Sequence, residues 1–368
     1  MTNSQRYLAL DVFRGMTIAS MILVNNPGSW SHIYAPLKHS EWHGCTPTDL
    51  IFPFFLFIVG VSMFFSFAKY GSTLNTKSLL KVLKRTALIF IIGLFLNSFP
   101  QWLTDYSKLR IMGVLQRIAL AYGIGSVIVL SLEKKWLPYL ALSILLLYWG
   151  ILYFFGGTDP FSLSGNTVPR FDSFILGEDH LYKGYGLPFD PEGLLSTIPA
   201  IATVIIGFLA GDLISRTDKS KLPLHLLLLG AGGIAIGAIW GVIFPINKPL
   251  WTSSYVIYTA AWACVIMAIL IWIIDIKGYS KWASFFVVFG MNSLFIFALS
   301  GIWARILLRI IKINENGTVV IGYNWLYQNI FQPLAGDING SLLFALSHIL
   351  VFWFICYVMY KRKIFIKV

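Results

Sequence analysis

The feature that most constrains this sequence is a series of long apolar stretches, separated by short segments that contain proline, glycine or charged residues. A stretch of about 18 or more apolar residues is long enough to cross the hydrocarbon core of a membrane as a helix. Only 12% of the 368 residues are charged, against about 25% in a typical soluble domain. We therefore predict an all-α, polytopic membrane helix bundle in which residues 1–368 form a single domain. The ten expected spans lie at roughly 7–26, 49–68, 84–100, 111–132, 136–155, 194–214, 223–245, 252–274, 283–304 and 342–360.

The basic residues between these spans predict the orientation of the bundle. If the N-terminus is cytoplasmic, the majority of the 28 lysines and arginines fall in cytoplasmic segments, as the positive-inside rule requires. Both termini are then cytoplasmic, and the loop after the first span faces outward. The first apolar stretch carries Asp11 and Arg14 and has no evident cleavage site, so we expect a retained helix. The net charge of +12 is spread between apolar segments, which argues against binding to nucleic acid.

Two outward segments have distinctive composition. The loop at about 156–193 is acidic, which is typical either of a solvated loop or of a surface that attracts a cationic amine. In residues 302–313, Arg305, Arg309 and Lys312 share one helical face, so we predict an interfacial helix there.

Two polar pairs lie inside predicted spans. Asp11 and Arg14 are three residues apart in the first span, where they can pair on neighbouring helical faces. Gln116 and Arg117 lie early in the fourth span, where the arginine needs Asp11, Asp49 or a bound phosphate as its anionic partner. Each pair is either a structural ion pair or part of a ligand site.

The first outward loop gathers many polar groups in a short stretch: Asn25, His32, His39, Trp42, His43 and Asp49. A histidine can take a proton near neutral pH, which an attacking ammonium group must lose. Asp49 either orients an imidazole or caps the second helix. His39 and His43 have a spacing that suits zinc on a helix, but no third ligand is well spaced.

Two further polar strings stand near or within predicted spans. The short turn between the seventh and eighth spans contains Asn247, and the ninth span contains Asn292. Both strings are consistent with the lining of a substrate pocket or with polar packing between membrane helices.

Taken together, these strings resemble the heparan-α-glucosaminide N-acetyltransferase family over nearly the whole chain. The matching strings are LDVFRG (10–15), VNNPG (24–28), KHSEWHG (38–44), TDLIFPFFLFIVG (48–60), RIMGVLQR (110–117), INKPLWTSSYV (246–256) and GMNS (290–293). Their order and spacing make the resemblance more specific than any one motif.

The resemblance implies an enzyme that moves an acetyl group from cytoplasmic acetyl-CoA to the amino group of a glucosamine-type sugar across the bilayer. It implies that His39 is the active-site histidine and that Asn25 is its polar partner. Asp11, Arg14, Gln116 and Arg117 would then shape the acetyl-CoA channel. The expected substrate-binding residues are Trp42, His43, Asp49, Asn247 and Asn292.

Two departures from the animal enzymes modify this expectation. The chain begins directly at the membrane core, which suggests a bacterial-type homologue of the inner membrane with a smaller sugar substrate. His43 stands where the animal pattern has asparagine, so a second imidazole could share the catalytic role. The oligomeric state is left open, with a homodimer as one arrangement, and no metal is expected.

Two other classes of function compete with the enzyme. A transporter or flippase for a sugar or lipid-linked sugar would also need buried polar residues, and it predicts inverted repeats and broken helices. A structural or sensory membrane protein explains none of the polar strings. Transfer of labelled acetyl from acetyl-CoA to glucosamine separates enzyme from carrier.

Overall fold

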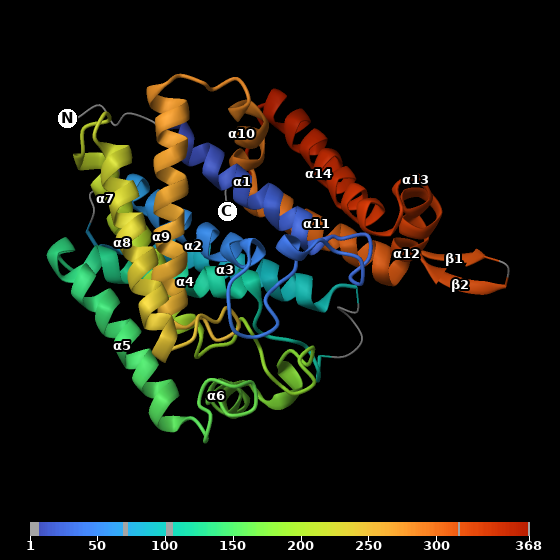
Figure 1. Ribbon diagram of the computed structural model, residues 1–368, viewed down its shortest axis with the longest axis horizontal. Coiled ribbons are helices and arrows are strands. Elements are labelled where there is room, and N and C mark those ends of the chain that lie inside the picture. Colours follow the sequence, from blue (N-terminus) through green and yellow to red (C-terminus); the bar gives the residue numbers. More distant parts are fainter. Residues whose placement is uncertain (1–6, 69–72, 101–105, 316, 367–368) are drawn as a thin grey trace.

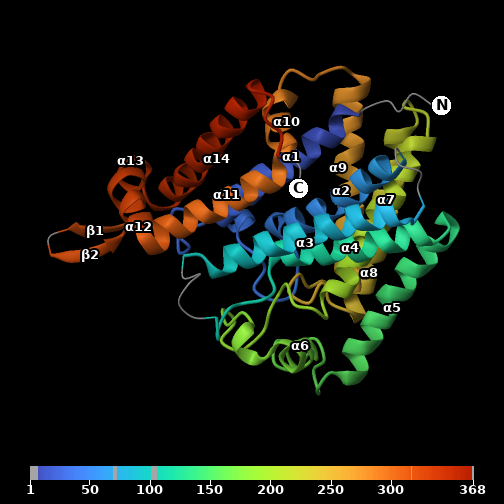
Figure 2. The same cartoon turned by 180° about the vertical axis from the view of Figure 1, so that it is seen from behind.

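The computed structural model describes residues 7–68, 73–100, 106–315 and 317–366 as a helical bundle with one small hairpin (Figures 1 and 2). The longer helices are α1 (Leu8–Asn25), α2 (Pro47–Ala68), α3 (Thr76–Ser98), α4 (Val114–Ser131), α5 (Leu137–Phe155), α7 (Thr197–Arg216), α8 (Leu222–Ile243), α9 (Ser253–Leu270) and α14 (Asp337–Lys361). The shorter helices are α6 (Val168–Leu176), α10 (Ala283–Met291), α11 (Ser293–Arg305), α12 (Gly322–Leu326) and α13 (Gln332–Ala335). Strand β1 (Lys312–Glu315) pairs antiparallel with β2 (Thr318–Ile321). Turns of 3₁₀-helix cover Ala35–Leu37, Lys134–Trp136 and Glu178–His180, and π-helical turns cover Ile271–Ile276, Ile306–Ile310 and Tyr327–Phe331.

The helices confirm the prediction of an all-α membrane bundle. Within the described residues, nine helices are long and apolar enough to cross a membrane, and each overlaps one of the ten predicted spans. The remaining predicted span, 84–100, falls on α3. That helix forms, but its first half carries Lys77, Lys81, Lys84 and Arg85, which makes it less apolar than the others.

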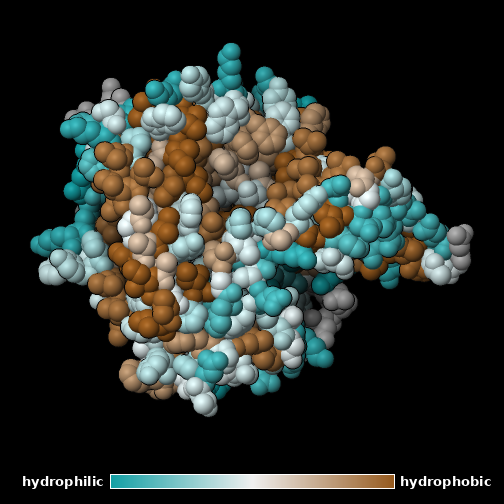
Figure 3. Space-filling model, in the orientation of Figure 1, coloured by the Kyte–Doolittle hydropathy of each residue, from teal (hydrophilic) through white to brown (hydrophobic). Residues whose placement is uncertain are grey.

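The exposed apolar surface is what a bilayer-facing protein requires. Figure 3 shows a broad hydrophobic band over the α8 and α9 side of the bundle. On α8, Ile239 and Val242 are among the most exposed large apolar side chains. A soluble protein rarely exposes an apolar surface of this extent, so the band indicates contact with lipid.

The ninth predicted span, 283–304, is not one continuous helix. It is broken at Asn292, which caps the end of α10 and precedes α11. The predicted helix at 302–313 forms as far as Ile310, but it is not a separate element, and its last three residues are not helical. The helix continues from α11 through a π-helical turn to Ile310, and Lys312 already begins β1. The arginine-rich pattern therefore marks the end of a long helix and not a separate element.

The centre of the bundle depends on close helix packing at two glycines. A Cβ at Gly60 of α2 would lie 2.1 Å from the carbonyl oxygen of Val204, and one at Gly207 of α7 would lie 2.1 Å from that of Phe57. Only hydrogen fits in these positions, so the α2 and α7 backbones approach as closely as small residues allow between membrane helices.

The connecting segments gather at two opposite ends of the bundle. The loop between α1 and α2, the turn between α8 and α9, and the long segment around α6 lie together at the lower end in Figure 1. We call this the His39 end. The start of α1 and the α9–α10 connection lie at the upper end, which we call the N-terminal end.

Candidate active site

At the His39 end, the loop before α2 is folded around one buried carboxylate. Asp49, in the first turn of α2, has a side chain that is only 1% exposed. Its Oδ2 accepts hydrogen bonds from the backbone N–H of Ser40 and from the backbone and hydroxyl of Thr46, each at 3.0 Å. These bonds draw the loop back onto the start of the helix and fix the position of His39.

The same carboxylate orients the imidazole of His39. Nδ1 of His39 lies 2.6 Å from Oδ1 of Asp49. Because an ionised carboxylate can only accept, Nδ1 carries the proton and donates it to Asp49. Nε2 is then the nitrogen that is free to bind a proton or to act as a nucleophile, and the 46% exposed side chain makes it accessible. A carboxylate that fixes the tautomer of a histidine is a recurring arrangement in catalysis.

The turn between α8 and α9 packs against the His39 loop. Asn247 donates from Nδ2 to the carbonyl oxygen of Trp42 at 2.9 Å, and this nitrogen lies 3.4 Å from Nδ1 of His43. The indole of Trp42 donates to the carbonyl oxygen of Phe161 at 2.8 Å, and its ring contacts that of Tyr185 edge-on. The structure thus brings together Trp42, His43, Asp49 and Asn247, which were all predicted as substrate-binding residues.

His43 differs from His39 in its surroundings. It lines a groove of about 420 Å³ between its own loop and the ends of α8 and α9. Burial lowers the pKa of His43 below its ordinary value, although the charge of Asp159 opposes this. The structure gives His43 an amide neighbour where it gives His39 a carboxylate.

A lysine that the sequence analysis did not single out completes this cluster. Nζ of Lys248 lies 3.1 Å from Nδ1 of His39 and 3.5 Å from Oδ1 of Asp49. Its sequence string was recognised, but the distance of more than 200 residues along the chain gave no sign of the contact.

The long segment around α6 adds a charged network beside the cluster. Arg110, which precedes α4, makes two hydrogen bonds to Asp190, at 2.8 and 2.7 Å, and one to Glu192 at 2.6 Å. Two of the loop's acidic residues therefore form a buried ion-pair network instead of a solvated face. Such a network holds the segment over the His39 end of the bundle.

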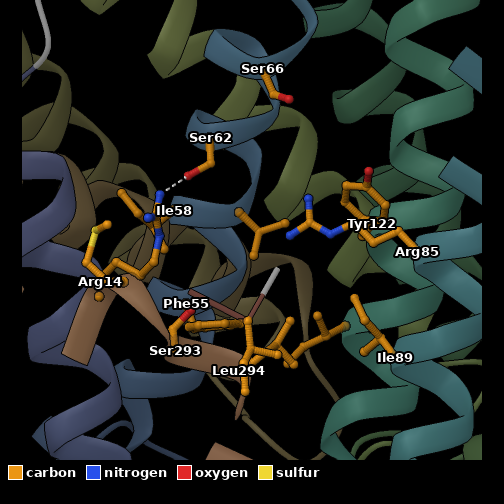
Figure 4. A pocket seen from close by; sticks show the side chains of 15 residues that line it. Arg14, Phe55, Ile58, Ser62, Ser66, Arg85, Ile89, Tyr122, Ser293 and Leu294 are labelled. Carbon is orange, nitrogen blue, oxygen red and sulfur yellow. Dashed lines mark hydrogen bonds between the residues drawn. The ribbon is translucent and has the colours of Figure 1, made fainter. Parts of the chain in front are cut away.

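Toward the N-terminal end, the bundle contains a cavity of about 380 Å³, which we call the inner cavity. Figure 4 shows Arg14 of α1 and Arg85 of α3 reaching into it from opposite walls. Arg14 donates to the hydroxyl of Ser62 at 2.5 Å and pairs with Asp11 at 3.5 Å. The guanidinium of Arg85 lies 4.5 Å from the ring centre of Tyr122. None of the described lining residues is acidic, so the cavity favours an anionic ligand.

The cavity extends along α2 toward the His39 cluster. Its lining runs from Ser66 to Phe55, which corresponds to roughly 16 Å of helix. Asp49 lies a further six residues along the same helix, or about 9 Å. Phe52 and Trp251, whose rings meet edge-on at 5.1 Å, lie in this interval.

Gln116 and Arg117 lie in the interior but not on the cavity wall. Arg117 is completely buried, with its guanidinium 4.9 Å from the ring centre of Trp251 and bonded to the hydroxyl of Ser196. Within the described residues, its Nε and Nη1 and the Nε2 of Gln116 have no hydrogen-bond partner. Donors of this kind are costly to bury, so they indicate a place for an acceptor group.

Two other predicted residues lie apart from the His39–Asp49 pair. Asn25 ends α1 with an exposed side chain, and within the described part of the chain no hydrogen bond joins it to His39. Its neighbour Asn26 is buried and donates to the carbonyl oxygen of Ile22 at 2.8 Å. Asn292 lies beside the inner cavity, where its amide binds the backbone of Ile364 and Ile366 at 3.1 and 2.8 Å. Ile366 itself lines the cavity.

The described ranges offer no cluster of ligands for the alternative of a zinc site. Among these residues, no three histidine, cysteine, aspartate or glutamate side chains gather closely enough to hold a metal ion.

Comparison with known proteins adds an independent line of evidence. Residues 6–230 match the family model described as "Heparan-alpha-glucosaminide N-acetyltransferase, catalytic". The mouse protein of that name is 28% identical over 100% of this chain and 61% of its own length. The human protein is 27% identical over 99% of this chain and 60% of its own length. The chain therefore spans about three fifths of the length of these relatives.

Proposed function

Because this chain belongs to the heparan-alpha-glucosaminide N-acetyltransferase family, we propose that it transfers an acetyl group across a membrane. The donor is acetyl-CoA, and the acceptor is the amino group of a glucosamine-type sugar. One observation carries the proposal: a single bundle holds a cationic cavity near one end and an accessible His–Asp pair at the other. In this proposal residues 1–368 act as one acyltransferase domain, located in a bacterial-type inner membrane.

The inner cavity suits the donor. The phosphates of acetyl-CoA are anionic, and Arg14 and Arg85 face the cavity with hydroxyl groups of Ser62 and Tyr122 among its lining. Phosphate recognition by arginine is strong because the planar guanidinium presents several donors. The pantetheine arm would extend from this cavity toward the His39 end, over a distance comparable with the roughly 20 Å length of that arm and less than the ~30 Å hydrocarbon core.

The His39 cluster suits the chemistry of transfer. The amine nitrogen attacks the thioester carbonyl carbon, the carbon–sulfur bond breaks, and the thiol of coenzyme A leaves. Nε2 of His39 either removes the proton of the amine or first carries the acetyl group. Asp49 holds the tautomer that leaves Nε2 free. Asn25 acts as a polar partner of this step once the acceptor is bound.

Gln116 and Arg117 have a role at the junction of the two sites. The unpartnered donors of Arg117 lie beside Trp251, whose ring meets that of Phe52 near the Asp49 end of α2, and the unpartnered Nε2 of Gln116 lies against Gly93 of α3. A thioester or amide carbonyl is an acceptor that can satisfy them, and a donor aimed at the thioester oxygen stabilises the oxyanion that forms during attack. The ring of Trp42 offers the flat apolar surface on which a sugar packs.

One observation favours the transporter as a second candidate. The helix broken at Asn292 beside the inner cavity is a feature expected of transporters. The matching family model is described as an N-acetyltransferase, and the accessible His39–Asp49 pair fits that chemistry, so we rank the transporter second.

Inverted membrane vesicles test both candidates together. With radiolabelled acetyl-CoA outside and glucosamine inside, we expect labelled N-acetylglucosamine in the lumen and none when His39 is replaced. In a parallel assay the label is on glucosamine. Labelled glucosamine that crosses the membrane unmodified, with no acetyl transfer in either vesicles or detergent, would reject the enzyme and support the carrier.

A further inference from the structure

The turn that carries Lys248 is held in one conformation by several buried contacts. The hydroxyl of Thr252 donates to the carbonyl oxygen of Pro245 at 2.9 Å and accepts from the backbone N–H of Asn247 at 3.0 Å. The side chain of Asn247 accepts from the backbone N–H of Leu250 at 2.7 Å. Trp251 is fully buried with a φ of 52°, in the left-handed region that a bulky side chain rarely adopts. Strain of this kind often marks a functional constraint.

The constrained turn places an ammonium group beside the catalytic imidazole. Lys248 has a side chain that is only 19% exposed, and its Nζ lies 3.1 Å from Nδ1 of His39. Nδ1 already donates to Asp49 at 2.6 Å, so it has no lone pair to offer the lysine. Lys248 therefore faces His39 as a charge and not as a hydrogen-bond donor.

Lys248 is one of several groups around Asp49. The carboxylate accepts four hydrogen bonds, from His39, Ser40 and two groups of Thr46, and the ammonium of Lys248 at 3.5 Å supplies the opposite charge that a buried carboxylate needs. The same ammonium lies closer to the imidazole, at 3.1 Å from Nδ1 of His39. Lys248 therefore acts on His39 as well as on Asp49.

The charges around His39 show what the lysine does. Alone, the Asp49 carboxylate would favour the imidazolium form, in which His39 cannot take another proton. The ammonium of Lys248 opposes this because a like charge disfavours protonation. We propose that Lys248 is a positioning residue that keeps the imidazole of His39 neutral and hence competent as a base or nucleophile. This inference rests on the proposed transfer reaction.

The other titratable groups near His39 do not change the opposition between the charges of Asp49 and Lys248. Burial raises the pKa of the Cys45 thiol to about 12 and raises the pKa of Tyr185, so both stay neutral at working pH. Glu192, which also acts on Lys248, is bonded to Arg110. Burial lowers the pKa of Lys248, and the charges of Asp49 and Glu192 oppose that effect. Lys38 and Glu41, on the His39 loop itself, are exposed and of opposite sign.

The pH dependence of transfer tests the role of Lys248. In Lys248→Met, we expect the acid limb of kcat/KM to move to higher pH by about one unit, since removing a nearby like charge makes protonation easier. Activity at pH 7 should fall several-fold, with about tenfold as the upper limit for a one-unit shift, and should recover at pH 8.5–9. Lys248→Arg should restore the original profile, and Lys38→Met, on the exposed part of the loop, is the matched control. An equal loss of kcat/KM at every pH, or an acid limb at the same pH as in the wild type, would overturn the inference.

A second measurement needs no turnover. Diethyl pyrocarbonate modifies neutral imidazole, and mass spectrometry of the peptide that contains His39 gives its modification rate at each pH. We expect the midpoint to rise in Lys248→Met and to stay in Lys248→Arg, with Lys248→Gln as a second neutral variant if the first does not fold. If the midpoint moves while the wild-type protein transfers no acetyl group, the proposed function fails and the charge balance stands. If transfer is observed and neither profile moves, Lys248 has no such role.

Discussion

His39 and His43 are four residues apart, but their surroundings give them different chemistry. Nδ1 of His39 contacts the buried carboxylate of Asp49, whereas Nδ1 of His43 faces the side-chain amide of Asn247. We expect His39→Ala to fold and bind acetyl-CoA but to lose transfer by about 10²–10⁴-fold, as is typical when a positioned base is removed. His43→Ala should keep substantial activity.

The comparison of these two variants in one acetylation assay also controls for damage to the loop. If His43→Ala is inactive while His39→Ala turns over normally, the roles are reversed. If both retain normal turnover, the active site lies elsewhere.

Asp172 predicts a pH dependence of stability. It is fully buried in α6; one carboxylate oxygen accepts from the backbone N–H of Leu195, and the other has no hydrogen-bond partner within the described residues. Burial raises the pKa of Asp172 to about 7, against about 4 in an unfolded chain. The folded protein therefore binds more protons than the unfolded chain between these values, and its free energy of unfolding falls as the pH rises from about 4 to about 7.

Thermal unfolding in detergent at pH 5 and pH 8 measures this effect. Asp172→Asn keeps the acceptor and removes the titration, so its unfolding midpoint should change less between the two pH values than that of the wild type, and it should be the more stable protein at pH 8. Asp179→Asn, an exposed carboxylate in the same segment, is the control. If the wild type and Asp172→Asn have the same unfolding midpoint at both pH values, the prediction is contradicted.

At the scale of residues, the sequence could identify polar residues of the site more readily than it could predict the contacts between them. His39 lies in the loop only ten residues before Asp49 in the first turn of α2, so their contact was within reach of sequence analysis. Lys248 and Arg117 meet their partners through folding of distant segments, and their contacts follow from no local pattern. Asn25 was chosen by its motif, but its side chain is exposed while that of Asn26 is buried, because adjacent positions on a helix face different directions.

At the scale of elements, the break at Asn292 and the chain segment after α14 belong together. The amide of Asn292 holds the backbone of Ile364 and Ile366, and Ile366 lines the inner cavity. Asn292→Ala removes both hydrogen bonds, so we expect this segment to leave the cavity more often. A cysteine at Ile366 should then react faster with maleimide, and the KM for acetyl-CoA should fall.

The matched control is Asn329→Ala, which removes an exposed asparagine from a helical turn elsewhere. Equal maleimide reactivity of the Ile366 cysteine in the two backgrounds would show that Asn292 does not hold the segment.

Hydropathy could predict where helices lie but not where one is interrupted. Residues 283–304 contain no charged side chain, and Asn292 differs little from the polar residues that other spans tolerate. The break is stabilised by hydrogen bonds to a segment more than 70 residues away. The change from helix to strand after Ile310 likewise depends on pairing with β2, which a helical charge pattern does not reveal.

At the scale of the whole molecule, most of what could be predicted follows from the physical requirements of the bilayer. Each backbone polar group must be satisfied within a membrane span, so apolar stretches of sufficient length have to be helices. The ten predicted spans all fall on helices for this reason. The arrangement of those helices around a cavity follows from close contacts such as those of Gly60 and Gly207, and the sequence alone did not place Arg85 in that cavity.

Arg85 supplies the test of the cavity as the donor site. Its guanidinium lies over Tyr122 and faces Arg14 across the cavity, and its Nε has no hydrogen-bond partner within the described residues. Acetyl-CoA and coenzyme A should both raise the unfolding midpoint of the wild type, because a ligand that binds only the folded state stabilises it by mass action. Arg85→Met should lose most of this shift, since it removes one of two cations that face the phosphates. Lys84→Met, the exposed neighbour on α3, removes the same charge outside the cavity and should keep the shift. An equal loss in the two variants would mean that net charge alone attracts the nucleotide, and a wild type that shows no shift at millimolar acetyl-CoA would place the donor outside this cavity.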